Sequence, residues 1–316
     1  MNFAVVMDSI HQIKPKTDTS LALLLSAKSR GWTLFYMEPK HLYVENGIAM
    51  GRMYPLDVTP NHDRWFTLGE EVHQPLSAID AICMRKDPPF DMEYIYATYI
   101  LETAEQQGCF VFNKPAALRD CNEKFFATRF SQCMAPTIVT KDIQLITTFM
   151  EKHDHVILKP MDWMAGTAIF HLKRSDPNHV MLLETFVDLP QRTVMVQKFI
   201  PEIATKGDKR IFIIDGEPLE QIFTRIPKEP GLPANNARGG SSVAVTLSDR
   251  DRWICAQVGP ILKQKGLLFS AIDVIGDFLT EINVTSPTGV RFIQQQYNVD
   301  VCKNILDIVA KRTTDR

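Results

Sequence analysis

Short apolar runs alternate with helix-like segments from the first residues onward, and this rhythm limits the possible fold more than any other feature. FAVVM (3–7) is followed by a helical pattern over about 20–30 and then by TLFYM (33–37). A long amphipathic segment from Asp91 to Gln107 lies between two further apolar runs. Strands separated by helices are typical of βαβ units with a parallel sheet. We therefore expect an N-terminal α/β, Rossmann-like domain over residues 1–120.

Chain length and charge narrow the class of protein. A domain usually takes about 150 residues, so the 316 residues of this chain indicate two or three domains. The chain carries 35 Lys and Arg against 37 Asp and Glu, which argues against a polybasic nucleic-acid binder. No apolar run approaches the roughly 20 residues of a membrane span, and the first residues lack a signal-peptide pattern. We expect a cytoplasmic globular protein that binds neither membranes nor nucleic acid, with reduced, structural cysteines.

The second half of the chain has a different rhythm, in which strands follow one another closely. HVILKP ends at Pro160, VMVQKFIP covers 194–201, and KRIFIIDGEP covers 209–218. The GEP turn after IFIID is typical of a hairpin connection. Ser248 is placed to cap a helix that runs to about Lys265. We therefore expect an antiparallel α+β part after the α/β domain.

The stretch FSAIDVIGDFLTEINVTSPT (269–288) contains the strongest candidate for a site. Side chains alternate along a strand, so Glu281 and Asn283 share one face. A three-residue loop at 276–278 would place Asp273 opposite Glu281 on that face, whereas a two-residue loop would place it on the other. Two carboxylates and an amide oxygen form a hard-oxygen site of the kind that Mg2+ uses, and the lack of His and Cys disfavours zinc. The alternative is a hairpin whose solvated face happens to carry these residues.

Two lysines are candidates for phosphate ligands. Lys124 lies in RDCNEKF, and Lys159 comes near the end of the apolar strand VILKP, before an irregular segment. An ammonium group at such a strand end is placed to act as a point charge on phosphate. A lone lysine on a helix is more often solvated, which is the alternative for Lys124.

These motifs, taken together, resemble those of the bacterial glutathione synthetase family. RDCNEK, ILKP, GDKR, DGEP, RIP and LTEINVTSPT occur in that order, and MRKDPPF and YIYATYILE extend the resemblance through the first domain. The resemblance implies an ATP-grasp fold, in which the nucleotide lies between two antiparallel α+β subdomains, here 121–200 and 201–316. It also implies a homotetramer that uses ATP with Mg2+ or Mn2+ and acts on small molecules.

The reaction that the resemblance implies joins γ-glutamylcysteine to glycine. The substrate carboxylate attacks the γ-phosphate of ATP, and the amine of glycine then displaces phosphate from the acyl phosphate. Such a phosphoryl transfer depends on positioning and on charge neutralisation, and it needs no nucleophilic side chain.

The resemblance also assigns residues to this reaction. Metal ions would be held by Asp273, Glu281 and Asn283, and phosphate oxygens would be contacted by Lys124 and Lys159. Adenine would meet the backbone of a hinge at Gln197, Lys198, Phe199 and Ile200, with Asp208 and Arg210 also near the nucleotide. Catalytic charge would come from Arg210, Arg225 and Arg238, and substrate would be bound by Arg85, Asn283, Ser286, Gly239 and Gly240.

Two loops depart from the family's pattern. DWMAG stands where the family has DGMGG, so Trp163 and Ala165 replace glycines that allow backbone amides to approach phosphate closely. LPANNARGGS keeps one arginine and two glycines, but Pro233 and Ser241 replace the flanking arginines. These changes leave two alternatives to glutathione synthesis. One is a diverged ATP-grasp ligase with another carboxylate and amine, and the other is a catalytically impaired nucleotide-binding homologue.

Overall fold

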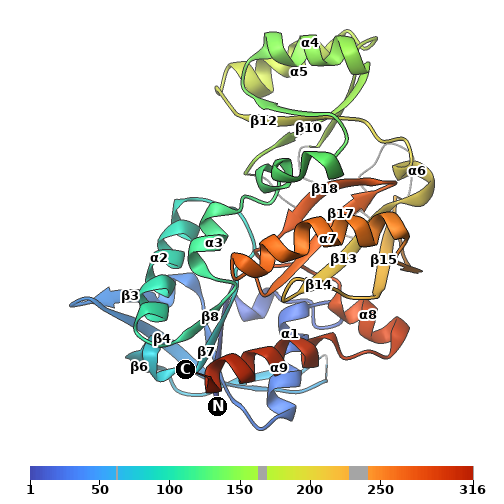
Figure 1. Ribbon diagram of the computed structural model, residues 1–316. Coiled ribbons are helices and arrows are strands. Elements are labelled where there is room, and N and C mark those ends of the chain that lie inside the picture. The colour runs from blue at the N-terminus through green and yellow to red at the C-terminus, as the bar shows by residue number, and fades with distance from the viewer. Residues whose placement is uncertain (62, 163–168, 228–240, 316) are drawn as a thin grey trace.

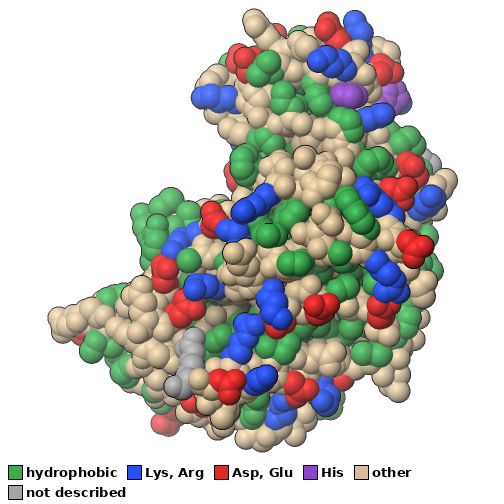
Figure 2. Space-filling model, viewed as in Figure 1, with side chains coloured by type: hydrophobic (Ala, Val, Ile, Leu, Met, Phe, Trp, Pro, Cys, Tyr) green, Lys and Arg blue, Asp and Glu red, His purple; other side chains and the backbone are tan. Residues whose placement is uncertain are grey.

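The computed structural model describes residues 1–316 except 62, 163–168, 228–240 and 316. In the described part of the chain the strands form three β-sheets. The N-terminal sheet lies at one end of the molecule in Figure 1, a small four-stranded sheet lies at the other, and the C-terminal sheet lies between them. None of the described helices is long and apolar enough to cross a membrane. Figure 2 shows acidic and basic side chains interspersed over the face in view.

The N-terminal sheet has a parallel centre with connecting helices. β1 (Asn2–Met7) pairs in parallel with β2 (Thr33–Met37) and β7 (Ala81–Arg85), and β7 pairs in parallel with β8 (Phe110–Phe112). Helices α1 (Thr19–Ser29) and α2 (Met92–Gln106) connect these strands, and α3 (Pro115–Asp120) follows them. Asp91 caps α2 by accepting a hydrogen bond from Tyr94 N at 2.9 Å. The predicted α/β arrangement is confirmed.

The sequence does not predict the antiparallel extension of this sheet. It consists of β3 (Leu42–Glu45), β4 (Ile48–Val58), β5 (Phe66–Leu68) and β6 (Val72–Pro75). At 11 residues β4 is long enough to pair with β3 and β6 at its start and with β2 and β5 at its end. Short 3-10 helices lie at Ile10–Gln12, Pro39–His41 and Leu76–Ala78.

The small sheet is antiparallel and has a core of its own. Its strands in order are β11 (Phe170–Lys173), β10 (His155–Pro160), β12 (Val194–Lys198) and β9 (Thr137–Thr140). Val156 and Leu158 pack under α4 (Ile143–His153) and α5 (Asn178–Leu183). Because side chains alternate along β10, Ile157 and Lys159 face the other way. A 3-10 segment (Phe125–Cys133) precedes the sheet, and a π-helical segment (Glu184–Asp188) extends α5.

The C-terminal sheet is also antiparallel. Its strands in order are β16 (Ser241–Thr246), β15 (Gln221–Ile226), β13 (Asp208–Ile214), β17 (Phe269–Ile275) and β18 (Phe278–Asn283), with β14 (Glu217–Pro218) beside β13. The short helix α6 (Ile203–Lys206) precedes the sheet, and α7 (Asp249–Gln264) lies across it in Figure 1. Ser248 caps α7 as predicted, in a reciprocal capping box with Asp251.

Two apolar cores join the first and third sheets into one body. One core combines Val6 and Ile82 of the N-terminal sheet with Ile211 and Ile272 of the C-terminal sheet. The chain ends with α8 (Val290–Tyr297) and α9 (Val301–Thr314), and α9 returns to the N-terminal sheet (Figure 1). Residues of α9 such as Ile305 therefore share a core with residues of β1.

The β17–β18 hairpin brings the predicted metal ligands into register through a short turn and a β-bulge. Its loop has only two residues, Gly276 and Asp277, and Gly276 has a φ of +57°, which suits a tight hairpin turn. A β-bulge then adds Thr280 on one strand, so that Asp273 pairs with Glu281. The predicted three-residue loop is therefore wrong. The predicted pairing of Asp273 with Glu281 is confirmed, because the bulge supplies the extra residue.

Candidate active site

Neighbouring strands of the C-terminal sheet bring five charged side chains to one face. Arg210 pairs with Asp273, Asp208 pairs with Arg225, and Asp273 pairs with Glu281. Directly opposed residues of antiparallel strands point to the same face. Asp208 and Arg210 are two residues apart on β13, so they also share that face. The sheet thereby gathers residues that are up to 73 positions apart in the chain.

Two arginines hold the carboxylate of Asp273. Arg210 binds it in a bidentate manner, with Nε 2.9 Å from Oδ1 and Nη2 2.8 Å from Oδ2. Arg225 places Nη2 2.9 Å from Asp273 Oδ2 and also donates to Asp208. Arg210 Nη1 further donates to the carbonyl and hydroxyl of Thr288, at 3.3 and 3.4 Å. Arg210, Arg225 and Asp273 are all buried, so these are not solvated surface ion pairs.

The two aspartates of this cluster differ in their pKa values. Burial acts to raise the pKa of Asp273, but Arg210 and Arg225 outweigh it and hold this pKa below its usual value. Burial raises the pKa of Asp208 to about 6, and Arg225 only partly opposes the shift. Asp208 Oδ1 and Arg225 Nε are buried and have no hydrogen-bond partner among the described residues. Buried polar atoms are nearly always paired, so this cluster has capacity for a ligand.

The two predicted lysines face this cluster. Lys124 is only 4% exposed, and its Nζ lies 3.4 Å from Glu281 Oε1, so the solvated alternative for Lys124 is wrong. Lys159 donates to Gln197 Oε1 at 3.3 Å. Burial lowers the pKa of Lys159, Glu281 opposes this shift, and Lys124 adds to it. The lysines therefore lie close to each other and to Glu281, between the small sheet and the C-terminal sheet.

The predicted metal ligands form a chemically suitable set of donors. Asp273, Glu281 and Asn283 offer carboxylate and amide oxygens, which are the ligands that Mg2+ prefers. The described residues contain no group of three or more His, Cys, Asp and Glu that could hold a metal, so the amide of Asn283 is needed to complete this set. Asn283 Nδ2 lies 3.2 Å from Asp273 Oδ2, which keeps the two side chains together. Asp208 Oδ1 nearby, which is buried and has no hydrogen-bond partner among the described residues, adds a further oxygen, and the residues fit a divalent cation.

The predicted hinge connects the small sheet to the C-terminal sheet. The backbone N–H groups of Lys198 and Phe199 already donate within the protein, to Pro136 O at 2.9 Å and His155 O at 3.0 Å. The ring of Phe199 stacks on that of His171 with the centroids 4.1 Å apart. His171 Nε2 is buried without a hydrogen-bond partner among the described residues. Sequence reasoning missed His171, which only the pairing of β11 with β10 places here.

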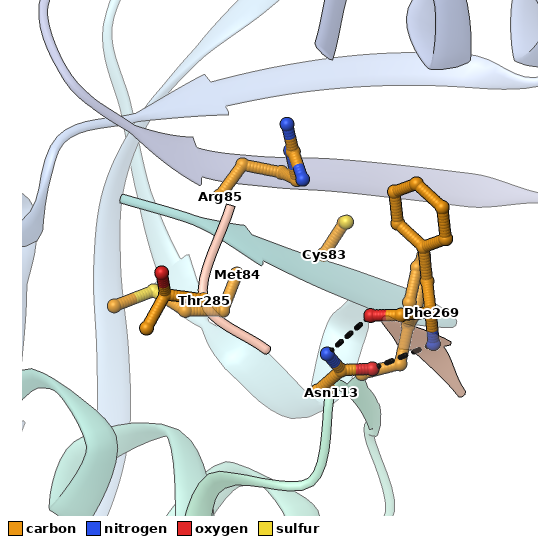
Figure 3. Close-up of a pocket in the computed structure, with 7 residues that line it drawn as sticks. Cys83, Met84, Arg85, Asn113, Phe269 and Thr285 are labelled. Carbon is orange, nitrogen blue, oxygen red and sulfur yellow. Dashed lines mark hydrogen bonds between the residues drawn. The ribbon is translucent and has the colours of Figure 1, made fainter. Parts of the chain in front are cut away.

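Arg85 ends β7 and reaches from the N-terminal sheet toward the segment that follows β18. Its Nε donates to Ser20 Oγ and its Nη2 to Pro287 O, both at 3.1 Å. Arg85 Nη1 is buried and has no partner in the described part of the chain. Figure 3 shows the small pocket beside it, lined by Cys83, Met84, Arg85, Phe112, Asn113, Phe269 and Thr285.

Several predicted residues lie outside the described part of the chain. They are Arg238, Gly239, Gly240, Trp163, Ala165 and Pro233, and the structure places none of them. Ser241 is described and begins β16. Ser286 lies between Thr285 and Pro287, both of which bond to other parts of the site.

The fold is similar to that of solved ATP-grasp proteins. A D-cycloserine synthetase matches 99% of this chain and 100% of its own, with a TM-score of 0.72 at 12% identity. A RiPP-associated ATP-grasp ligase from Chryseobacterium gregarium, solved with ADP and peptides, matches 99% of this chain and 97% of its own, with a TM-score of 0.66 at 14% identity. At such low identity the likeness concerns the fold alone, and it confirms the predicted ATP-grasp fold.

Sequence comparison identifies the family within this class. Residues 1–119 match the N-terminal domain of prokaryotic glutathione synthetase, and residues 123–298 match its ATP-grasp domain. The glutathione synthetase of Pseudomonas putida is 51% identical, covering 100% of this chain and 99% of the relative. Those of Shewanella oneidensis and Escherichia coli are 50% and 45% identical, covering 99% of this chain and 99% and 98% of the relatives. This chain belongs to the prokaryotic glutathione synthetase family, as its motifs predict.

Proposed function

We propose that this chain makes glutathione, by ligating γ-glutamylcysteine to glycine at the expense of ATP. One observation carries the proposal: a buried cluster of arginines and aspartates faces two lysines from outside the C-terminal sheet. The proposal is supported by the 51% identity, over the whole chain, to an enzyme named glutathione synthetase.

The charges of the site suit a complex of metal and nucleotide. The positive groups are Lys124, Lys159, Arg210 and Arg225, and the negative groups are Asp208, Asp273 and Glu281, which leaves one positive charge in excess. A nucleoside triphosphate carries about four negative charges at neutral pH, so these residues alone do not balance it. Divalent cations supply the remaining charge in enzymes that transfer phosphoryl groups.

The side chains of this site position reactants and neutralise charge. Lys124 and Lys159 hold phosphate oxygens, while Arg210 and Arg225 stabilise the charge that develops as the substrate carboxylate attacks the γ-phosphate. ADP leaves as the carboxylate attacks, which gives the acyl phosphate. The amine of glycine then attacks the acyl carbon and loses a proton, and phosphate leaves with one oxygen of the original carboxylate. No side chain of the protein forms a covalent bond with a substrate in these steps.

The divalent cation is Mg2+, or Mn2+ in its place. Asp273, Glu281 and Asn283 would hold it, and it would neutralise and orient the phosphates. In this structure Arg210 and Arg225 occupy both oxygens of Asp273. An ionised carboxylate has about four lone-pair sites, so Asp273 can hold a cation while Arg210 and Arg225 stay beside it, near the phosphate and the acyl phosphate.

The substrates bind around this centre. Arg85 offers a carboxylate of γ-glutamylcysteine its Nη1, which has no partner within the described residues, and Ser286 contributes beside it. The backbone at 197–200 contacts adenine, with Asp208 near the nucleotide. Arg238, Gly239 and Gly240 belong to a loop that closes over the acyl phosphate and excludes water.

Further features of the proposal extend beyond the site. The chain divides into an N-terminal domain (1–120) and two ATP-grasp subdomains (121–200 and 201–316), acts as a homotetramer, and works in the cytoplasm. The altered loops at Trp163 and Ser241 motivate two alternatives, a ligase for other substrates and an impaired nucleotide-binding homologue. The high identity to glutathione synthetases along the whole chain favours glutathione synthesis over both.

A substrate-omission assay tests the proposal. Purified protein is given ATP, Mg2+, γ-glutamylcysteine and glycine, phosphate release is followed, and each component is omitted in turn. Turnover that requires all four supports glutathione synthesis. Turnover only with another carboxylate or amine would establish the diverged ligase, and ATP binding without turnover would establish the impaired homologue.

A further inference from the structure

Glu123 has a buried carboxylate to which the proposed reaction gives no role. It precedes Lys124 in the chain and is 4% exposed. A single oxygen, Oε1, accepts hydrogen bonds from Val284 N at 2.7 Å, Thr285 N at 2.9 Å and Thr285 Oγ1 at 2.8 Å. One oxygen that accepts from two consecutive backbone N–H groups and a hydroxyl fixes the backbone that carries these donors.

The backbone of Glu123 holds the same segment from its other end. Ile282 N donates to Glu123 O at 2.9 Å. Glu123 therefore binds the chain on both sides of Asn283, at residue 282 and at residues 284–285. Asn113 also holds this segment, because its Nδ2 donates to Val284 O at 2.7 Å. Figure 3 shows that Asn113 is hydrogen-bonded to Phe269 as well.

The neighbours of Glu123 connect this segment to the other half of the site. Asn122 Nδ2 donates to Met161 O at 3.0 Å, two residues after Lys159. Lys124 Nζ lies 3.4 Å from Glu281 Oε1. Three consecutive residues thus tie the end of β10, which carries Lys159, to the end of β18, which carries Glu281 and Asn283.

We propose that Glu123 is a positioning residue, which keeps the amide of Asn283 in register with the carboxylates of Asp273 and Glu281. This inference rests on the proposed metal role of Asn283. Without Glu123, three donors of residues 284 and 285 lose their acceptor inside the protein, and the segment shifts to find other partners. Removing a residue that orients a metal ligand typically weakens metal binding about 10–100-fold.

The test measures binding of Mn2+ to the complex of the protein with ADP, by electron paramagnetic resonance. We expect Glu123→Ala to weaken Mn2+ binding about tenfold or more and Glu123→Gln to weaken it less, because glutamine keeps an acceptor oxygen. Affinity for ADP without metal should stay unchanged in both. Glu151→Ala, at an exposed position of α4, is the matched control and should match wild type. Unchanged Mn2+ affinity in folded Glu123→Ala would overturn the proposal.

Milder variants keep the test decisive if Glu123→Ala does not fold. Thr285→Val removes one of the three donors and should weaken Mn2+ binding, whereas Thr285→Ser keeps the hydroxyl and should restore it. Equal affinities in these two variants would contradict the positioning role. Glu281→Ala distinguishes an error in the proposed metal site from an error in the role of Glu123. If Glu281→Ala leaves Mn2+ affinity intact, the proposed metal site itself is wrong. If Glu281→Ala weakens Mn2+ binding but Glu123→Ala does not, only the role of Glu123 is wrong.

Discussion

Replacing Asp273 by asparagine should destabilise the protein strongly even without nucleotide. Asp273 is 3% exposed, accepts two charged hydrogen bonds from Arg210 and forms an ion pair with Arg225. Asp273→Asn leaves Arg225 with Asp208, but it leaves the charge of Arg210, which is 7% exposed, with neutral acceptors: the new amide oxygen and the two oxygens of Thr288. Removing one partner of a buried ion pair costs about 3–5 kcal/mol, and we expect a loss of that size.

Urea-induced unfolding, followed by circular dichroism and tryptophan fluorescence at pH 7, measures this loss. The matched control is Asp277→Asn, the same change at an exposed turn position four residues away, which should cost less than about 0.5 kcal/mol. Adding Arg210→Gln to Asp273→Asn should recover part of the loss, because the unpaired charge disappears. A loss below about 1 kcal/mol, or strictly additive effects in the double variant, would refute the argument that these charges stabilise each other.

Three further predictions concern pH, backbone and substrate. The folded-state pKa of Asp208 is raised above its usual value, so its contribution to stability is lost as pH rises through about 6. The unfolding free energy of wild type should therefore fall relative to that of Asp208→Asn between pH 4 and 7. A difference between the two proteins that stays constant over this range would contradict the prediction. Gly207→Ala makes a Cβ clash with Arg225 O at a φ of +72°, so it should lower the melting temperature well beyond Gly47→Ala, whose Cβ meets nothing within 4 Å among the described residues. Equal losses would be inconsistent with the clash. Arg85→Gln should raise KM for γ-glutamylcysteine about 10–100-fold and leave KM for ATP unchanged, as expected for a lost charged hydrogen bond. An unchanged KM for γ-glutamylcysteine would show that Arg85 does not bind this substrate.

Local signals in the sequence predict the elements well, because their causes are local. Asp91 and Ser248 cap helices through their own side chains, and both helices begin where the capping residues indicate. The alternation of apolar runs likewise predicts the parallel strands of the N-terminal sheet. The family motifs identify the family, which the matches along the whole chain confirm.

The geometry of the site depends on contacts that are distant in sequence, so the sequence predicts it only in part. The pairing of Asp273 with Glu281 follows from alternation, but the two-residue turn and the bulge at Thr280 do not. The ion pair between Arg210 and Asp273 spans 63 positions and exists only because β13 and β17 are neighbours. Glu123 gives no signal of its own, since a glutamate beside a lysine is usually solvated, and only the fold shows that its carboxylate is buried.

Ligation through an acyl phosphate is tested by the transfer of an isotope from the substrate carboxylate to phosphate. The protein is incubated with ATP, Mg2+, glycine and γ-glutamylcysteine whose reacting carboxylate carries 18O on both oxygens, and the phosphate released is analysed by mass spectrometry. We expect one 18O atom in each phosphate and one in each new amide. Phosphate free of label, formed together with glutathione, would contradict attack of the carboxylate on the γ-phosphate.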